Sequence, residues 1–228
     1  MKLFSTSFAV ISALALLHTP LAAQSLSVAH VSAAQVTCAF DPSCTASGTK
    51  TSANLINYMQ GEVALVTTRT LPGLAGSKAA GKTGYEFQID LTAVPINGGS
   101  ECVVGMVFGF TAIDLVNYSG SGPTDLYVIT SGSHGSIAPT AANLIAPGLV
   151  EVDFAGGICA GQASDPVGLS SSQGSPAAAD IRLLDPGSVP ILNVGARIPS
   201  GSIGVSGPSP PTNLRVVNPW KSSPVERI

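Results

Sequence analysis

The segment from Gly76 to Thr83 carries the most specific chemical signature in this 228-residue chain. It reads Gly-Ser-Lys-Ala-Ala-Gly-Lys-Thr, a complete match to the phosphate-loop pattern G-x-x-x-x-G-K-[ST]. A working loop of this kind is followed by a helix, because loop amides and the helix N-terminus together hold the phosphate. Here Gly84 and an alternating strand follow instead. We therefore expect a small-residue loop between strands and no nucleotide cofactor.

Two further strings contain potential nucleophiles. Ser133 precedes His134, but triad chemistry needs a nucleophile, a base and an orienting acid that the fold brings together. The string Gly157-Ile-Cys-Ala-Gly161 has the spacing of a nucleophile elbow, with Cys159 in place of serine. Such an elbow needs a strand-to-helix turn, and a disulfide at Cys159 would remove the thiol. We therefore assign no catalytic residue and expect a protein that is not an enzyme.

Acidic residues are scattered, and none has the spacing of a calcium-binding loop. Glu151 and Asp153 share one face of a predicted strand, and a weak cation site there is one interpretation of the pair. A solvated outer face is the better interpretation of that pair. We predict no metal and no cofactor.

The four cysteines are Cys38, Cys44, Cys102 and Cys159. An even number in an exported chain predicts disulfides, and no C-x-x-C pair supports a zinc site. Three pairings are possible. The Asp41-Pro42 turn favours a local Cys38–Cys44 bond, which leaves Cys102 to pair with Cys159.

The N-terminus has the layout of a secretory signal peptide over residues 1–23. Lys2 supplies the positive charge, residues 8–17 form a short apolar run, and Leu21-Ala-Ala23 provides a small-residue cleavage site. The apolar run is about ten residues long, whereas a membrane-spanning helix needs roughly 20. We expect a protein secreted to the periplasm or the extracellular space, with no membrane span after cleavage.

Charge is sparse, at 10% of residues, and the formal net charge is −3 at pH 7. The chain has no basic stripe that could neutralise phosphates, so nucleic-acid binding lacks electrostatic support. Glycine and proline are abundant, with 25 and 17 residues. This composition favours short strands joined by many turns.

Strand patterns recur without helices between them, which predicts an antiparallel β-sandwich of about seven or more strands, stapled by disulfides. The alternating segment 85–94 and the apolar segment 102–115 form the best hairpin candidate, and residues 163–178 have the composition of a loop. The strand candidates are 62–68, 85–94, 102–115, 125–130, 149–154, 179–184 and 191–198. The predicted organisation is a signal peptide (1–23), an extended lead-in with a short disulfide loop (24–60), a sandwich domain (61–198), and a Pro/Ser/Gly linker with a disordered tail (199–228).

Several local strings resemble exported bacterial proteins of the choice-of-anchor and PEP-CTERM-associated kind. The strings are Thr70–Leu91, Glu101-Cys102, Tyr127–Gly132 and Gly157–Gly161. The resemblance covers roughly residues 60–195 and implies a β-sandwich, a cysteine pair at Cys102 and Cys159, and a surface or matrix location. It implies no catalytic residues. The C-terminal residues 218–228 lack the sorting segment of those proteins, so we expect a freely secreted or periplasmic form.

The leading functional hypothesis is a non-enzymatic exported protein with a structural, adhesive or matrix-associated role. Its partners would be extracellular polysaccharide or proteins of the envelope or matrix. A carbohydrate-binding module is the first alternative and a secreted hydrolase the second. Sugar binding usually uses exposed aromatic rings, and aromatic residues make up only 5% of the chain. The candidate rings are Tyr85, Tyr118, Tyr127 and Trp220.

Overall fold

The computed structural model describes residues 23–54, 65–96, 102–133, 135–188, 190–202 and 205. Over these residues the chain forms twelve strands and one helix. The strands are β1 (Gln24–Ser25), β2 (Val28–Ser32), β3 (Thr49–Asn54), β4 (Leu65–Pro72), β5 (Thr83–Asp90), β6 (Val103–Gly109), β7 (Leu126–Ser131), β8 (Ala141–Ala146), β9 (Leu149–Ile158), β10 (Val167–Ser171), β11 (Pro176–Leu184) and β12 (Pro190–Pro199), and the helix is α1 (Ala33–Phe40).

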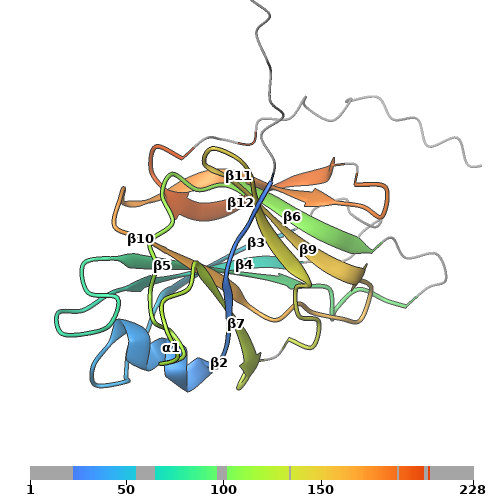
Figure 1. Ribbon diagram of the computed structural model, residues 1–228. Coiled ribbons are helices and arrows are strands. Elements are labelled where there is room, and N and C mark those ends of the chain that lie inside the picture. Colours follow the sequence, from blue (N-terminus) through green and yellow to red (C-terminus); the bar gives the residue numbers. More distant parts are fainter. Residues whose placement is uncertain are drawn as a thin grey trace, which may run out of the picture.

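Two six-stranded sheets pack face to face (Figure 1). Sheet A has the order β1-β8-β9-β6-β11-β12, and sheet B has the order β2-β7-β10-β5-β4-β3. Neighbouring strands are antiparallel except β2 and β7, which run parallel. The predicted disulfide-stapled β-sandwich is confirmed.

The main core lies between the two sheets and follows the alternation of the sequence. On β5, Tyr85, Phe87 and Ile89 point inward and are fully or almost fully buried. They face the aromatic side chains of β6 and the residue after it, and the ring centroids of Phe87 and Phe108 lie 4.7 Å apart. Contacts of this kind contribute about 0.5–1.5 kcal/mol each beyond their burial. The large alternating residues are therefore what joins the sheets.

The predicted hairpin between segments 85–94 and 102–115 is wrong. The strand β5 pairs with β4 and β10 in sheet B, whereas β6 pairs with β9 and β11 in sheet A. The two segments meet through their side chains across the core, not through backbone hydrogen bonds. Alternation identifies the buried face of each strand, but it does not identify the pairing partner.

Strand β10 differs from the loop predicted over residues 163–178. It lies in the middle of sheet B, between β7 and β5, and all five of its residues are buried. Small residues are needed here because aromatic side chains cross its outer face. The Tyr118 hydroxyl donates to the hydroxyl of Ser170 at 2.8 Å, and the ring of Tyr127 lies over Gly168. Strand β8, which lies next to β9, is also absent from the strands predicted from sequence.

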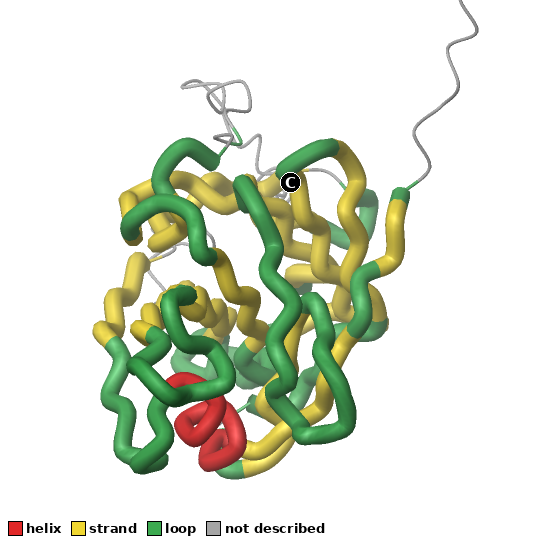
Figure 2. The backbone as a smooth tube through the Cα atoms, turned by 60° about the vertical axis from the view of Figure 1, so that its left-hand side comes forward, coloured by secondary structure: helices red, strands yellow, loops and turns green. Residues whose placement is uncertain are grey.

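The expected extended lead-in, 24–60, differs from the structure over its described part. Residues 24–54 form β1, β2, α1 and β3, and these strands pair within both sheets. The helix, red in Figure 2, begins with a capping box between Ser32 and Gln35. Its Phe40 side chain packs against the outer face of sheet B. The helix has only eight residues, too few for a clear 3.6-residue period to stand out.

Both predicted disulfides are present. The Cys38–Cys44 bond closes a short loop at the end of α1, and the Cys102–Cys159 bond joins the start of β6 to the end of β9. The second bond links neighbouring strands of sheet A, because Val103 is paired with Ile158. Residues 1–22 of the predicted signal peptide, and residues 203, 204 and 206–228 of the predicted linker and tail, lie outside the described residues.

Candidate functional site

The phosphate-loop string forms the connection between β4 and β5. The amide of Ala79 donates to the carbonyl of Ala39, and the amide of Leu74 donates to that of Phe40. Strand β5 begins at Thr83, so the string is followed by a strand. The loop amides hold the loop against α1, and the expected loop between strands is confirmed.

The nucleophile candidates are occupied or outside the described residues. Cys159 is bonded to Cys102 and therefore offers no thiol. The Ser133 hydroxyl donates to the carbonyl of Ile129 at 3.1 Å. His134 lies outside the described residues.

Glu151 and Asp153 lie on the outer face of β9 and are partly buried rather than fully solvated. Burial raises the pKa of Glu151, and the charge of Asp153 raises it further. The side-chain amide of Asn143 donates to Asp153 at 3.4 Å. In the described part of the chain, no three or more His, Cys, Asp or Glu side chains are grouped to hold a metal ion.

Glu151, which lies beside Asp153, is expected to make the stability of the fold depend on pH. Because the pKa of Glu151 is raised in the folded state, the folded protein binds its proton more tightly than the unfolded chain, and stability falls as pH rises through this pKa. At pH 7, Glu151→Gln is expected to raise the free energy of unfolding by less than about 0.5 kcal/mol, since water screens a half-exposed charge. Urea unfolding at pH 7 and at pH 3 measures the effect.

The gain should vanish at pH 3, where the carboxyl group is protonated in both states. Asp180→Asn, an exposed change on β11 of the same sheet, is the control and should leave stability unchanged. A gain of equal size at both pH values would show that the effect is not electrostatic.

A row of residues with an ion pair at its centre crosses the outer face of sheet B. The strand register places Lys50 opposite Arg69, Arg69 opposite Glu86, Glu86 opposite Gly168, and Gly168 opposite Tyr127. Directly paired residues point to the same side of a sheet. We call these five residues the polar row.

An ion pair forms the centre of the polar row. Arg69 Nη2 lies 2.7 Å from Glu86 Oε2, and the Tyr127 hydroxyl donates to the same carboxylate oxygen at 3.3 Å. Glu86 is only 8% exposed. Burial and the charge of Glu86 raise the pKa of Tyr127 well above its ordinary value, so its hydroxyl stays protonated and can donate. The carboxylate is therefore held from two sides.

Glycine at position 168 is a steric requirement of this arrangement. A Cβ atom on Gly168 would lie 2.1 Å from Cζ of Tyr127. The absence of a side chain lets the tyrosine ring cross β10 and reach Glu86 on β5. Helix α1 and Tyr118 complete the cover over Tyr127, which is fully buried.

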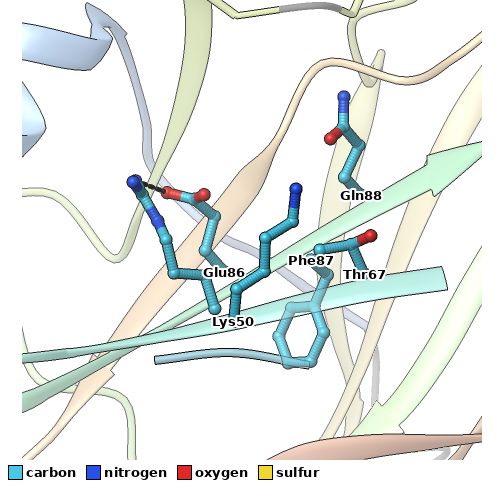
Figure 3. A pocket seen from close by; sticks show the side chains of 6 residues that line it. Lys50, Thr67, Glu86, Phe87 and Gln88 are labelled. Carbon is cyan, nitrogen blue, oxygen red and sulfur yellow. Dashed lines mark hydrogen bonds and ion pairs between the residues drawn. The ribbon is translucent and has the colours of Figure 1, made fainter. Parts of the chain in front are cut away.

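The end of the polar row near β3 borders a cavity of about 130 Å³. It is lined by Lys50, Thr67, Arg69, Glu86, Phe87 and Gln88. Figure 3 shows that Lys50, Glu86 and Gln88 rise from one side of the strands, whereas Phe87 points to the other side, toward the core. Lys50 is exposed and has no ion-pair partner among the described residues.

Two further side chains on the rim of the cavity are positioned by hydrogen bonds. The Gln88 amide donates to the carbonyl of Ser164 at 3.1 Å, and the hydroxyls of Thr67 and Ser52 lie 3.1 Å apart. Such groups can donate to and accept from a polar ligand. The arrangement suits binding: an exposed cation, a fixed ion pair and hydroxyl and amide groups surround a small cavity.

Sequence patterns did not identify the residues of this site. Lys50, Arg69 and Glu86 lie on three strands, and only the strand register brings them together. One signal was present: in a chain with few charges, Arg69 is the single charged residue of β4, and Glu86 lies in the middle of β5. Pairing β4 with β5 across the loop that contains the phosphate-loop string would have placed them side by side.

The aromatic residues named as candidate sugar contacts do not form an exposed platform. Tyr85, Tyr118 and Tyr127 are each 0% exposed and belong to the hydrophobic cores. Trp220 lies outside the described residues. Any saccharide contact in the described part of the chain would therefore depend on polar groups rather than on these three rings.

In the described part of the chain, no helix is long and apolar enough to cross a membrane. The two disulfides indicate an oxidising compartment, which is extracellular or periplasmic. Comparisons of the chain with family models, with curated proteins and with solved structures find no match.

Proposed function

We propose that this protein is an exported, non-enzymatic β-sandwich that acts by adhesion or structural association in the cell envelope or extracellular matrix. Export is supported by the signal-peptide pattern of residues 1–23 and by the two disulfides. A matrix location is also what the resemblance to choice-of-anchor proteins implies.

The polar row and its cavity carry the binding part of the proposal. The charged groups are held in place by the register of three strands and by the buried Tyr127. Their open end presents the exposed cation of Lys50 beside the amide of Gln88. A site whose groups are already in position loses less entropy on binding. This favours recognition of a polar partner at the surface.

The same geometry supports a role without catalysis. A general base must offer a free lone pair to the substrate at hydrogen-bond distance. Glu86 Oε2 instead accepts from both Arg69 and Tyr127, and Glu86 is 8% exposed, so this oxygen is engaged within the protein. The carboxylate therefore serves to hold its neighbours in place.

The test expresses the 228-residue chain with its own N-terminal segment and determines the location, the disulfides and the first residue of the product. We expect the protein outside the cytoplasm, with both disulfides formed and Gln24 as its first residue. We also expect the purified oxidised protein to sediment with envelope or matrix material isolated from the producing organism. Retention of the protein in the cytoplasm, or its failure to sediment with any such fraction, would contradict the proposal.

An activity screen tests the non-enzymatic part separately. Panels of esterase and glycosidase substrates should show no turnover above buffer. Turnover that is lost in a folded Glu86→Gln variant would assign catalysis to the polar row and overturn this part of the proposal.

A further inference from the structure

We infer that the cavity at the end of the polar row binds the carboxylate of an acidic saccharide unit, such as a uronate residue of an anionic polysaccharide. The inference rests on the proposed function and specifies its ligand class. It places the saccharide above β3, β4 and β5, on the side from which Lys50, Glu86 and Gln88 rise (Figure 3).

The charge of the cavity selects an anion. Arg69 and Glu86 neutralise one another at 2.7 Å, so Lys50 leaves the lining with a net charge of one positive unit. Lysine acts as a compact, flexible point charge that can follow a carboxylate. Because Lys50 is exposed and unpaired among the described residues, contact with an anion breaks no existing ion pair.

Arg69 provides a second set of donors. Glu86 engages Nη2, and Nε is buried without a hydrogen-bond partner. A guanidinium has five N–H donors; one binds Glu86 and one, on the buried Nε, is closed to solvent, so three remain for a ligand. The Arg69 side chain is 27% exposed, which leaves part of it open to solvent beside Lys50. A carboxylate above the ion pair can therefore interact with both cations.

The rim and size of the cavity favour one sugar ring. Thr67 and Gln88 provide the hydroxyl and amide that ring hydroxyls require. The volume of about 130 Å³ is several times the ~30 Å³ share of a single water molecule. It is smaller than the roughly 300–1,000 Å³ of pockets that enclose drug-sized ligands. We therefore expect weak binding per site, with Kd on the order of 0.1–1 mM, strengthened when a polymer engages several molecules.

The experiment titrates the oxidised protein, residues 24–228, with trigalacturonate and follows backbone amide shifts by NMR. We expect saturable shifts in β3, β4 and β5, with affinity that falls as salt is added. Lys50→Ala should weaken binding about tenfold. Lys78→Ala removes an exposed lysine in the loop between β4 and β5, outside the cavity lining, and is the matched control that should leave affinity unchanged.

Two comparison ligands show whether binding needs a negative charge and whether that charge must be a carboxylate. A neutral galactose trimer should bind at least tenfold more weakly than trigalacturonate, and a sulfated galactose trimer, which carries no carboxylate, tests whether a sulfate ester replaces the carboxylate. Equal binding of the neutral trimer, stronger binding of the sulfated trimer, or no loss in a folded Lys50→Ala variant would overturn the inference. If the protein still sediments with matrix material in these cases, the proposed function survives and only the ligand inference fails. If the protein neither binds trigalacturonate in this way nor sediments with matrix material, the inference and the proposed function both fail.

Discussion

Replacing Gly168 with alanine is expected to destabilise the protein by about 3 kcal/mol, although it adds only one methyl group. The new Cβ would lie 2.1 Å from Tyr127 Cζ, so the buried ring must move. Overpacking of this kind costs about 1–3 kcal/mol, and the displaced tyrosine also loses its hydrogen bond to Glu86. Urea unfolding of the oxidised protein, monitored by circular dichroism, measures the loss.

Gly195→Ala is the matched control, because it makes the same change in a strand where a new Cβ would meet nothing within 4 Å. We expect it to change stability by less than about 0.5 kcal/mol. The same Gly168→Ala change in a protein that lacks the Tyr127 ring tests whether the clash with that ring is the cause. If Tyr127 is first changed to leucine, the Gly168→Ala substitution should cost much less. Equal losses in both backgrounds would show that contact with the tyrosine ring is not the cause.

The fold class could be predicted because alternation and composition are local properties of the chain. Val150, Val152 and Phe154 alternate with polar residues on β9, and the structure places all three in the core. The turn at Asp41-Pro42 likewise indicated the short disulfide, which is confirmed. Such features depend on residues close in sequence, so no knowledge of the sheet order is needed.

Strand pairing and the candidate site depend on contacts between distant segments. Strand β10 contains two serines and a glycine in five residues, a composition typical of loops, yet it is central in sheet B. Its small residues are explained only by the rings of Tyr118 and Tyr127 that cross it from β7 and the preceding loop. Their positions follow from tertiary packing, which overrides local propensity.

The polar row shows the same limit for function. The phosphate-loop string contains Lys82, but the cavity is bordered instead by Arg69 and by Lys50, which lies in a segment expected to be an extended lead-in. Lys50 gains its position because β3 pairs with β4 at the edge of sheet B. A motif search examines residues adjacent in sequence, whereas this site is assembled from one residue on each of several neighbouring strands.

The second large effect is expected from the Cys102–Cys159 disulfide. The bond spans 57 residues and limits the conformations of the unfolded chain far more than the six-residue Cys38–Cys44 bond. On the chain-entropy model, the longer bond contributes about 4 kcal/mol and the shorter about 2 kcal/mol. The double change Cys102→Ala with Cys159→Ala should therefore lower the free energy of unfolding by about 4 kcal/mol in non-reducing urea titrations.

The matched control is the double change Cys38→Ala with Cys44→Ala, which removes the same atoms and should cost about half as much. Since the longer bond ties together β6 and β9 in the centre of sheet A, its loss should also speed amide hydrogen exchange in those strands first. The shorter bond lies at the end of α1, so its loss should speed exchange in the helix instead. Equal destabilisation by the two double changes would argue against the entropic origin. Exchange that rises uniformly in both proteins would show that the bonds stabilise the fold only as a whole.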